Sequence, residues 1–234
     1  MKCPNMFLKI SEGILTGSKC GMFKEIDVPS NVIVIGQGAF EYSKITSITI
    51  PRGVGSIGKR AFAGSRLTSV RIPHTVFSIE EEAFAGSMLT SVTIEEGYSD
   101  RKLGMDAFKG TKLKSVTIPC NVKKIGIGAF SECRELESVT LSHGVEEIGV
   151  SAFAFCSKLK TITIPQSVTK IMPSAFHHCD GLHINYEGTE QQWDAIQKYY
   201  YLTQKGENGK TELVPSEELE LPPDSSITYN YTRK

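Results

Sequence analysis

Apolar and polar residues alternate in a pattern that returns at a nearly constant interval along most of the chain. Residues 67–84 show it as LTSVRIPHTVFSIEEEAF, and residues 113–130 and 159–176 repeat it as LKSVTIPCNVKKIGIGAF and LKTITIPQSVTKIMPSAF. The common frame is L-x-x-V-x-I-P-x-x-V-x-x-I-x-x-x-A-F. Self-similarity at steps of 22 to 24 residues is the signature of a repeat architecture. An Ala-Phe pair closes each of seven units, at Phe40, Phe62, Phe84, Phe108, Phe130, Phe153 and Phe176.

Each unit predicts two short extended segments and a bend. Val70 and Ile72 alternate with polar residues, as in a strand with one buried face. Pro73 has no backbone N–H and therefore ends that strand. Val76 and Ile79 form a second apolar pair, which indicates a second extended segment, and the Ala-Phe pair follows on a turn or bend.

A unit of this size cannot bury its own apolar residues, so successive units must stack and cover each other. Strands of neighbouring coils would then pair in parallel, about 4.8 Å apart. We expect the phenylalanine rings to form a column along the rod. The alanine before each Phe indicates a place where coils stack too closely for a larger side chain.

The position three residues after each Phe is always small and weakly polar, so we expect it to form a buried ladder with thiols in its last three rungs. It is occupied by Ser43, Ser65, Ser87, Thr111, Cys133, Cys156 and Cys179. Two alternatives remain for the thiols. One is a metal site together with His177 or His178. The other is a disulfide between adjacent rungs, whose spacing of about 5 Å lies within the usual range, although three rungs would leave one thiol over.

The other three cysteines lie outside this ladder. Cys120 follows a proline at an expected strand end. Cys3 and Cys20 could bridge in an oxidising location, and the sequence leaves their pairing open. No CxxC motif or zinc-type pair of pairs is present.

Three regions are expected along the chain: residues 1–22, the repeat array at 23–186, and residues 187–234. Alternating apolar residues around a turn predict that the first region is a hairpin covering the first coil. Such a cap is needed because the terminal coils of a rod expose their core.

The third region begins with a predicted helix. Thr189 and Gln192 form a capping-box pattern, and Trp193, Ile196 and Tyr200 share one helical face. We expect this helix to lie over the last coil. A long polar loop, in part disordered, is expected over residues 203–226, and a final strand over residues 227–232.

The frame, written with its cysteine as LTSVTIP-x-x-V-x-x-IG-x-x-AF-x-x-C, resembles the BspA-like leucine-rich repeats of gut and oral bacteria and some protozoa. The best matches are residues 113–133 and 159–179, and the resemblance covers roughly residues 23–186. The family implies an α/β, β-rich repeat solenoid, coiled right-handed, with a parallel sheet on its concave face. It also implies a location on the cell surface and roles in adhesion or protein binding.

Charge and hydropathy narrow the function and location. Lys and Arg total 26 and so do Asp and Glu, whereas nucleic-acid binders usually carry a basic surplus. No apolar run approaches the ~18 residues of a membrane span. Lys9, Ser11 and Glu12 interrupt the apolar core that a secretory signal needs. The chain is thus expected to be secreted or on the cell surface if a leader was removed, and cytoplasmic if it is complete as given.

Catalytic motifs are absent from the sequence: there is no GxSxG, HExxH or GxxxxGK[ST]. His74 and His143 have no obvious Asp or Ser partner in the same or adjacent coils, and His177 and His178 are expected to point apart on a turn. The acidic run 80–82 consists of chain neighbours, which do not face each other as a general acid and base must. We expect no catalysis, metal or cofactor.

The outward strand positions are almost uniform. Eleven of the twelve are Ser or Thr, and the exception is Arg71. Binding hot spots favour Trp, Tyr and Arg, so specificity is expected at the edge of the sheet and on the longer fourth unit. The candidate recognition surface comprises Arg52, Arg71, His74, Tyr98, Asp100, Arg101 and His143.

The leading hypothesis is a non-catalytic repeat module that binds a protein or a cell-surface ligand, with adhesion as one role. A carbohydrate-binding module is the first alternative, which Tyr98 and the tyrosines at 199–201 keep open. An intracellular scaffold or a structural spacer is the second. A binding module would present a local patch of exposed aromatic or charged residues, and a spacer would not.

Overall fold

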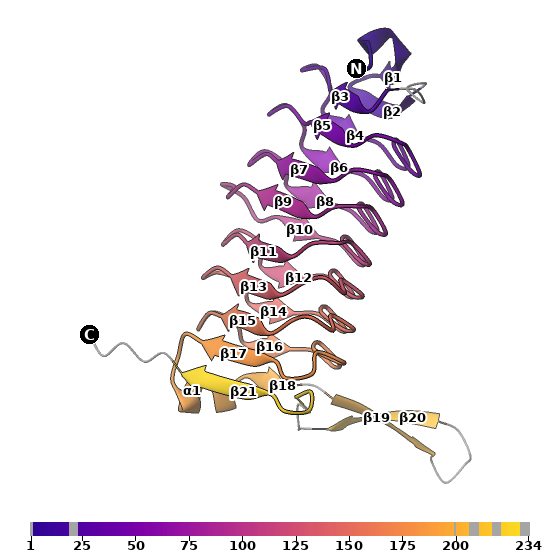
Figure 1. The fold of residues 1–234 in the computed structure, drawn as a ribbon. Coiled ribbons are helices and arrows are strands. Elements are labelled where there is room, and N and C mark those ends of the chain that lie inside the picture. The colour runs from indigo at the N-terminus through magenta and orange to yellow at the C-terminus, as the bar shows by residue number, and fades with distance from the viewer. Residues whose placement is uncertain (1, 19–22, 199, 206–210, 217–220, 230–234) are drawn as a thin grey trace.

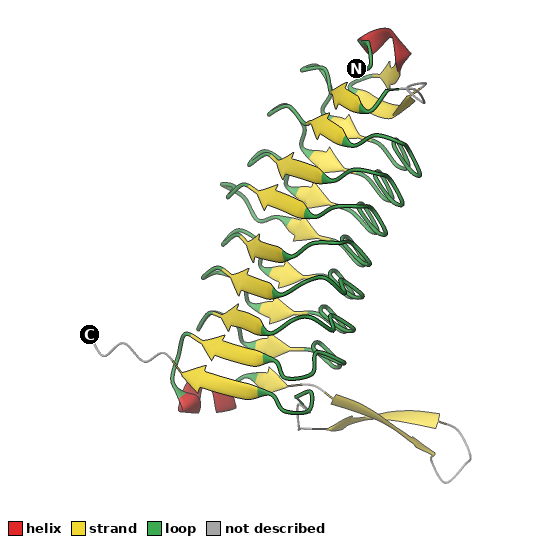
Figure 2. Cartoon of the chain, in the orientation of Figure 1, coloured by secondary structure: helices red, strands yellow, loops and turns green. Residues whose placement is uncertain are grey.

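The chain coils into a long stack of parallel strands. The computed structural model describes residues 2–18, 23–198, 200–205, 211–216 and 221–229. The coils follow one another from the N-terminus, and the hairpin of β19 (Tyr200–Lys205) and β20 (Thr211–Ser216) lies beyond the last of them (Figure 1). Within the described residues, helix is confined to η1 (Asn5–Phe7) and α1 (Glu190–Asp194) (Figure 2). The architecture is a parallel β-solenoid of about eight turns.

The V-x-I segment of each unit forms the longer strand of each coil. These strands pair in parallel within three separate sheets of two, two and five strands, with the same frame position side by side, as Val116, Val139 and Ile162 illustrate. The alternating burial expected from the sequence is confirmed, since Val70 and Ile72 are buried between exposed neighbours. The strands are β3 (Glu25–Asp27), β5 (Ser47–Thr49), β7 (Ser69–Ile72), β9 (Ser91–Ile94), β11 (Ser115–Ile118), β13 (Ser138–Leu141), β15 (Thr161–Ile164), β17 (His183–Tyr186) and β21 (Ser226–Tyr229).

The second member of each unit's second apolar pair lies in a row of two-residue strands: Ile79 belongs to β8, whereas Val76 precedes that strand. At the N-terminal end, β1 (Leu8–Ser11) and β2 (Ile14–Ser18) form the expected antiparallel hairpin, and β2 continues this row by pairing with β4. The row consists of β4 (Val34–Ile35), β6 (Ser56–Ile57), β8 (Ser78–Ile79), β10 (Lys102–Leu103), β12 (Lys124–Ile125), β14 (Glu147–Ile148), β16 (Lys170–Ile171) and β18 (Gln197–Lys198).

The phenylalanines form the expected column inside the rod. Successive rings are stacked with centroids 5.0–6.0 Å apart and with interplanar angles of 2–11°. All seven rings are buried, and so are the seven alanines that precede them. Each coil thus adds one ring to a column that no coil could shield from water alone.

Each Ala-Phe turn contains two residues in the left-handed region, two positions before and two positions after the Phe. Their φ values lie between 52° and 66° in all seven turns. Glycine occupies only some of these positions, and L-residues adopt this conformation at a cost of about 1–2 kcal/mol. Arg60, Asp106 and Phe155 are non-glycine examples. The regular stacking of the turns therefore maintains a backbone shape that an isolated turn would avoid.

Backbone hydrogen bonds join each Ala-Phe turn to the next in one direction. Three N–H groups of each turn donate to three carbonyls of the following turn. They belong to the Phe itself, to the residue two positions before it and to the residue two positions after it. In the first turn these donors are Gly38, Phe40 and Tyr42, and their acceptors are the carbonyls of residues 59, 61 and 63. The same three bonds recur at all six junctions, with N···O distances of 2.7–3.0 Å.

The buried ladder next to the phenylalanine column changes chemistry along the rod. The thiols of Cys133, Cys156 and Cys179 are fully buried, as predicted, and each contacts the Phe carbonyl of the preceding turn at 3.0–3.2 Å. In the serine rungs, the hydroxyls of Ser65 and Ser87 are buried without a hydrogen-bond partner.

The cysteine ladder contains no disulfide, because Cys133, Cys156 and Cys179 are all free. Cys3 is disulfide-bonded, and Cys20 lies outside the described residues. The sequence left open whether Cys3 forms a disulfide, and the structure shows that it does.

The C-terminal region differs from the expected loop. Thr189 caps α1 with the predicted capping box, and Trp193 and Ile196 are buried, but the helix has only five residues. Part of the region expected as a loop over residues 203–226 forms the β19–β20 hairpin. The prediction missed the Asn-Gly pair at 208–209 between two strand-like runs, a common hairpin signal. The expected return strand is present as β21 beside β17, while residues 230–232 lie outside the described residues.

Candidate functional site

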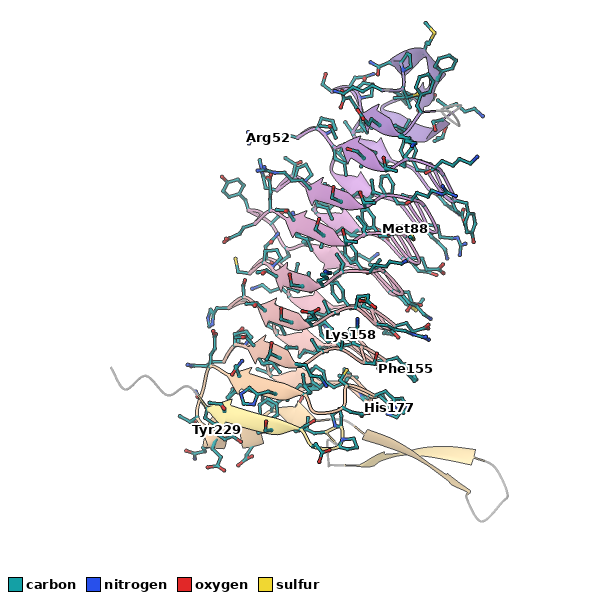
Figure 3. The ribbon with its side chains drawn as sticks, in the orientation of Figure 1. Arg52, Met88, Phe155, Lys158, His177 and Tyr229 are labelled. Carbon is teal, nitrogen blue, oxygen red and sulfur yellow. The ribbon has the colours of Figure 1, made fainter. Side chains whose placement is uncertain are left out.

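The two long edges of the solenoid carry different side chains. The residue two positions after the V-x-I segment varies from coil to coil, and Arg52 marks this variable edge in Figure 3. The Ala-Phe turns form the opposite edge, where Phe155 and His177 lie together (Figure 3). The variable edge carries most of the predicted recognition residues.

A carboxylate organises the best-formed cluster on the variable edge. Glu95 accepts hydrogen bonds from Arg71 Nε at 2.5 Å and from the backbone N–H of His74 at 3.0 Å. The Nδ1 atom of His74 lies 3.2 Å from the same carboxylate. The Arg71 guanidinium and the His74 contacts hold the pKa of Glu95 at about 2, below its ordinary value of 4.5. The carboxylate is therefore charged at neutral pH and fixes both basic neighbours.

An exposed aromatic ring completes the cluster. Tyr98 is 99% exposed, and its ring meets the edge of the His74 ring at a centroid distance of 5.8 Å. Arg71 has only its Nε atom paired among the described residues, so its terminal nitrogens remain available at an exposed side chain. We name Arg71, His74, Glu95 and Tyr98 the edge patch.

Arg101 is buried, although it was expected on the exposed surface. It is 2% exposed, and its guanidinium donates to the carbonyls of Pro73, Val76 and Glu95. Burial lowers the pKa of this side chain. Arg101 therefore supports the backbone beneath the edge patch and does not contribute to its outer surface.

The remaining predicted residues lie apart from the edge patch. Arg52, Asp100 and His143 are all exposed. Arg52 and His143 belong to coils on either side of the patch, so the structure distributes them along the edge and does not bring them into one site. Asp100 lies on the inserted segment after Tyr98.

Sequence reasoning missed the partner of His74, which is Glu95 in the next coil. One signal was present: Glu95 stands where five of the seven units have proline. Proline there would remove the side chain that joins Arg71 to His74. The break in the repeat therefore coincides with the only His–carboxylate ion pair among the described residues.

The Ala-Phe turn edge also differs from expectation at one point. His177 and His178 were expected to point apart, yet their ring centroids are 4.1 Å apart, and both lie near Phe155. His178 adopts the left-handed conformation, with φ of 58°. Ion pairs link neighbouring coils on this edge, with Lys59 against Glu81 and Arg60 against Glu82.

Neither edge presents a metal-binding geometry. Among the residues that the structure describes, no group of three or more His, Cys, Asp or Glu side chains is placed to hold a metal ion. In the same part of the chain, no helix is both long and apolar enough to span a bilayer.

Comparison with known proteins places these features in context. Residues 9–101 and 101–191 match the model of the BspA type leucine-rich repeat region, in six copies. A leucine-rich repeat protein from Bacteroides ovatus is 30% identical, with a TM-score of 0.66, over 79% of this chain and 49% of that one. This chain thus spans about half the length of that relative.

A second similar structure is the leucine-rich repeat protein of T. pallidum. It is 25% identical, with a TM-score of 0.66, over 78% of this chain and 91% of that protein. No curated protein matches.

Proposed function

This chain belongs to the BspA-type leucine-rich repeat family, and from that premise we propose that it is a non-catalytic module that binds a protein ligand through the edge patch. A repeat array supplies an extended surface for binding or structure. The edge patch supplies what a uniform Ser/Thr sheet lacks, namely an exposed Tyr and Arg of the types that dominate binding hot spots.

The observation that carries this proposal is the fixed arrangement around Glu95. Holding Arg71 and His74 in place before binding reduces the conformational entropy lost on association. The free terminal nitrogens of Arg71 suit a bidentate contact with a ligand carboxylate, while the Tyr98 ring offers apolar area beside it. A protein segment that combines an acidic and an apolar side chain fits this chemistry.

The test uses a paired set of variants on the full chain. Arg71→Ala/Tyr98→Ala removes the two contact groups, and Arg134→Ala/Tyr42→Ala removes the same residue types at other exposed positions. Binding is measured on a panel of immobilised extracellular-matrix proteins. We expect at least a tenfold loss for the first pair and no loss for the second.

The alternatives predict different results in the same experiment. A carbohydrate-binding module would bind a glycan array and leave the protein panel empty. A scaffold or spacer would bind neither array nor panel. Equal losses for the two variant pairs would show that the edge patch is not the binding surface.

Adhesion requires a location outside the cell, which the family resemblance implies. We expect protease treatment of intact source cells to remove this chain while a cytosolic control protein survives. Protection of the chain, with the band in the soluble lysate, would contradict adhesion and favour an intracellular protein partner.

The finer features of the fold belong to the same proposal. We take the coil to be right-handed with the longer strands on its concave side, as the family resemblance implies. The β1–β2 hairpin and the segment containing α1 are assigned as caps, because Leu15 and Trp193 place apolar side chains in the core at the two ends. An experimental structure of the full chain would test the handedness and both caps.

A further inference from the structure

The hydrogen bonds between Ala-Phe turns run one way, so the last turn is left with unused donors. The corresponding N–H groups in the seventh turn are those of Ser174, Phe176 and His178. None of the three has a hydrogen-bond partner within the described part of the chain. Their counterparts one turn earlier, in Ser151, Phe153 and Phe155, all donate to carbonyls of the seventh turn.

Two of these residues line a cavity at the end of the array. The cavity has a volume of about 450 Å³, and Ser174, His177, His178 and Asp180 form one wall while residues 221–223 form the other. Pockets of about 300–1,000 Å³ accommodate small ligands or peptide segments. Phe176, between Ser174 and His178 in the chain, is 2% exposed. The N–H of Phe176 has no acceptor within the described part of the chain, and an unsatisfied donor in a largely buried residue costs free energy until an acceptor is supplied.

The two walls are fastened to each other by the backbone. The N–H of Gly181 donates to the carbonyl of Pro223 at 2.9 Å, and the N–H of Ser226 donates to the carbonyl of Leu182 at 3.0 Å. The pairing of β17 with β21 continues from there. The cavity is therefore built by the fold and lies between two fixed segments, with Leu221 and two prolines providing apolar surface opposite the histidines.

The interior junctions show which chemistry satisfies these donors. At each junction, the three N–H groups meet three separate carbonyl oxygens on alternate residues of one chain segment. A single small anion cannot replace three separate acceptors in a row. A peptide backbone can, as in other cases where a segment adds to an unpaired edge.

We propose that the C-terminal turn is a docking site for a short peptide segment of a partner protein, which presents alternate backbone carbonyls to Ser174, Phe176 and His178. The segment lies between the histidines and residues 221–223. This site is at the end of the Ala-Phe turn edge and is separate from the edge patch, so either proposal can fail without the other.

The test uses a peptide that copies the acceptors of an interior junction. Residues 127–131 supply the carbonyls of Ile127, Ala129 and Ser131 to the turn before them. The probe is this five-residue sequence, acetylated and amidated. Ser replaces Phe130 because Phe176, the last ring of the column, is only 2% exposed and leaves little surface for a further ring to stack on. A second peptide has alkene isosteres in place of the two peptide bonds and the C-terminal amide that contain those carbonyls. A third has them at the two alternate bonds.

The measurement is amide NMR on the full chain, with Ser151, Phe153 and Phe155 as internal controls. In the free protein, we expect hydrogen exchange at Ser174, Phe176 and His178 to be at least about 100-fold faster than at those controls. The first and third peptides should shift the three donor amides and slow their exchange, and the second should not. A Tyr98→Ala variant should bind the peptide unchanged.

Three results would overturn the proposal. The first is donor exchange in the free protein that is as slow as in the controls, which would mean that the donors already have partners. The second is no shift of the three amides with the first peptide up to millimolar concentration. The third is equal binding of all three peptides, which would exclude the alternate carbonyls as the recognised groups.

Discussion

The serine rungs and the cysteine rungs occupy the same position in the repeat but satisfy their polar atoms differently. Cys133, Cys156 and Cys179 direct their thiols at carbonyls of the preceding turn. Ser65 and Ser87 bury hydroxyls without partners. The cysteine units have one extra residue before the next Leu. A larger, weakly polar atom in a slightly longer turn therefore fits this slot better than a hydroxyl does.

The thiols of the ladder also differ in burial from Cys120, a further free cysteine among the described residues. Contacts with Cys133 and Cys179, together with burial, raise the pKa of the Cys156 thiol and keep it neutral. The thiol of Cys120 is partly exposed on the variable edge, 2.8 Å from a carboxylate oxygen of Glu96. All three ladder thiols are buried, whereas the thiol of Cys120 is partly accessible to solvent.

The largest expected effect concerns the column that both kinds of rung share. Phe108→Ala removes a fully buried ring at the boundary between the serine and the cysteine rungs, and should lower the free energy of unfolding by ~3–5 kcal/mol. Chemical denaturation of the variant measures this. A loss below ~1 kcal/mol would contradict the continuous column.

The next effect exchanges the chemistry of a single rung. Cys156→Ser places a hydroxyl at the ladder position where the hydroxyl of Ser65 has no partner, and should cost about 1–3 kcal/mol in the free energy of unfolding. Cys156→Ala is the matched control, because it removes the sulfur without adding a hydroxyl. A smaller loss for Ser than for Ala would show that the slot does accept a hydrogen bond.

Removing a hydroxyl that has no partner from a serine rung should stabilise the protein. Ser65→Ala removes a buried hydroxyl without a partner, and we expect the free energy of unfolding to rise by up to about 1 kcal/mol. Thermal denaturation compares it with Thr111→Ala, where the hydroxyl does contact a thiol at 3.2 Å and a loss is expected. Destabilisation of both variants by the same amount would remove the distinction between the rungs.

A smaller effect distinguishes the buried ladder from the exposed edge. Because the folded-state pKa of Glu95 is about 2 and its ordinary value is 4.5, its contribution to stability is present above pH 4.5 and is lost as the pH falls toward 2. The Arg71 partner is largely exposed, so the loss should be below about 1 kcal/mol. An NMR titration of the Glu95 carboxyl, with Glu95→Gln as control, checks the direction. A midpoint at or above 4.5 would contradict it.

The last prediction involves no change in stability and concerns which cysteines a thiol reagent can modify. A thiol reagent should modify Cys120 in the folded protein and reach Cys133, Cys156 and Cys179 only after unfolding. Mass spectrometry after brief labelling counts the modified sites. Modification of a ladder cysteine at the same rate as Cys120 would show that the ladder opens locally.

Features that recur seven times could be predicted from the sequence. The register of Phe108 or of Cys156 follows from comparison with six other units, because each position repeats the same packing problem. The strands, the ring column and the buried thiols were therefore expected correctly. The β19–β20 hairpin occurs once, so no second copy of it corrected the expectation of a loop.

The edge patch was predicted only in part, for a related reason. Arg71 was singled out as the exception on the Ser/Thr face, His74 as a variable edge residue and Tyr98 as part of the longer fourth unit. The carboxylate that joins Arg71 to His74 lies in the following coil. The burial of Arg101 was missed because arginine is rarely buried unless its charge is paired or its donors are satisfied. Here three backbone carbonyls accept hydrogen bonds from the Arg101 guanidinium, and this geometry depends on the folded path of the inserted segment.

The one-way hydrogen bonding of the Ala-Phe turns has a consequence for how such a chain can grow. Every interior junction presents the same three donors and receives the same three acceptors, so a gene segment that encodes one unit can be duplicated or deleted by recombination without leaving a mismatched seam. The length of the array can therefore change by whole units over generations.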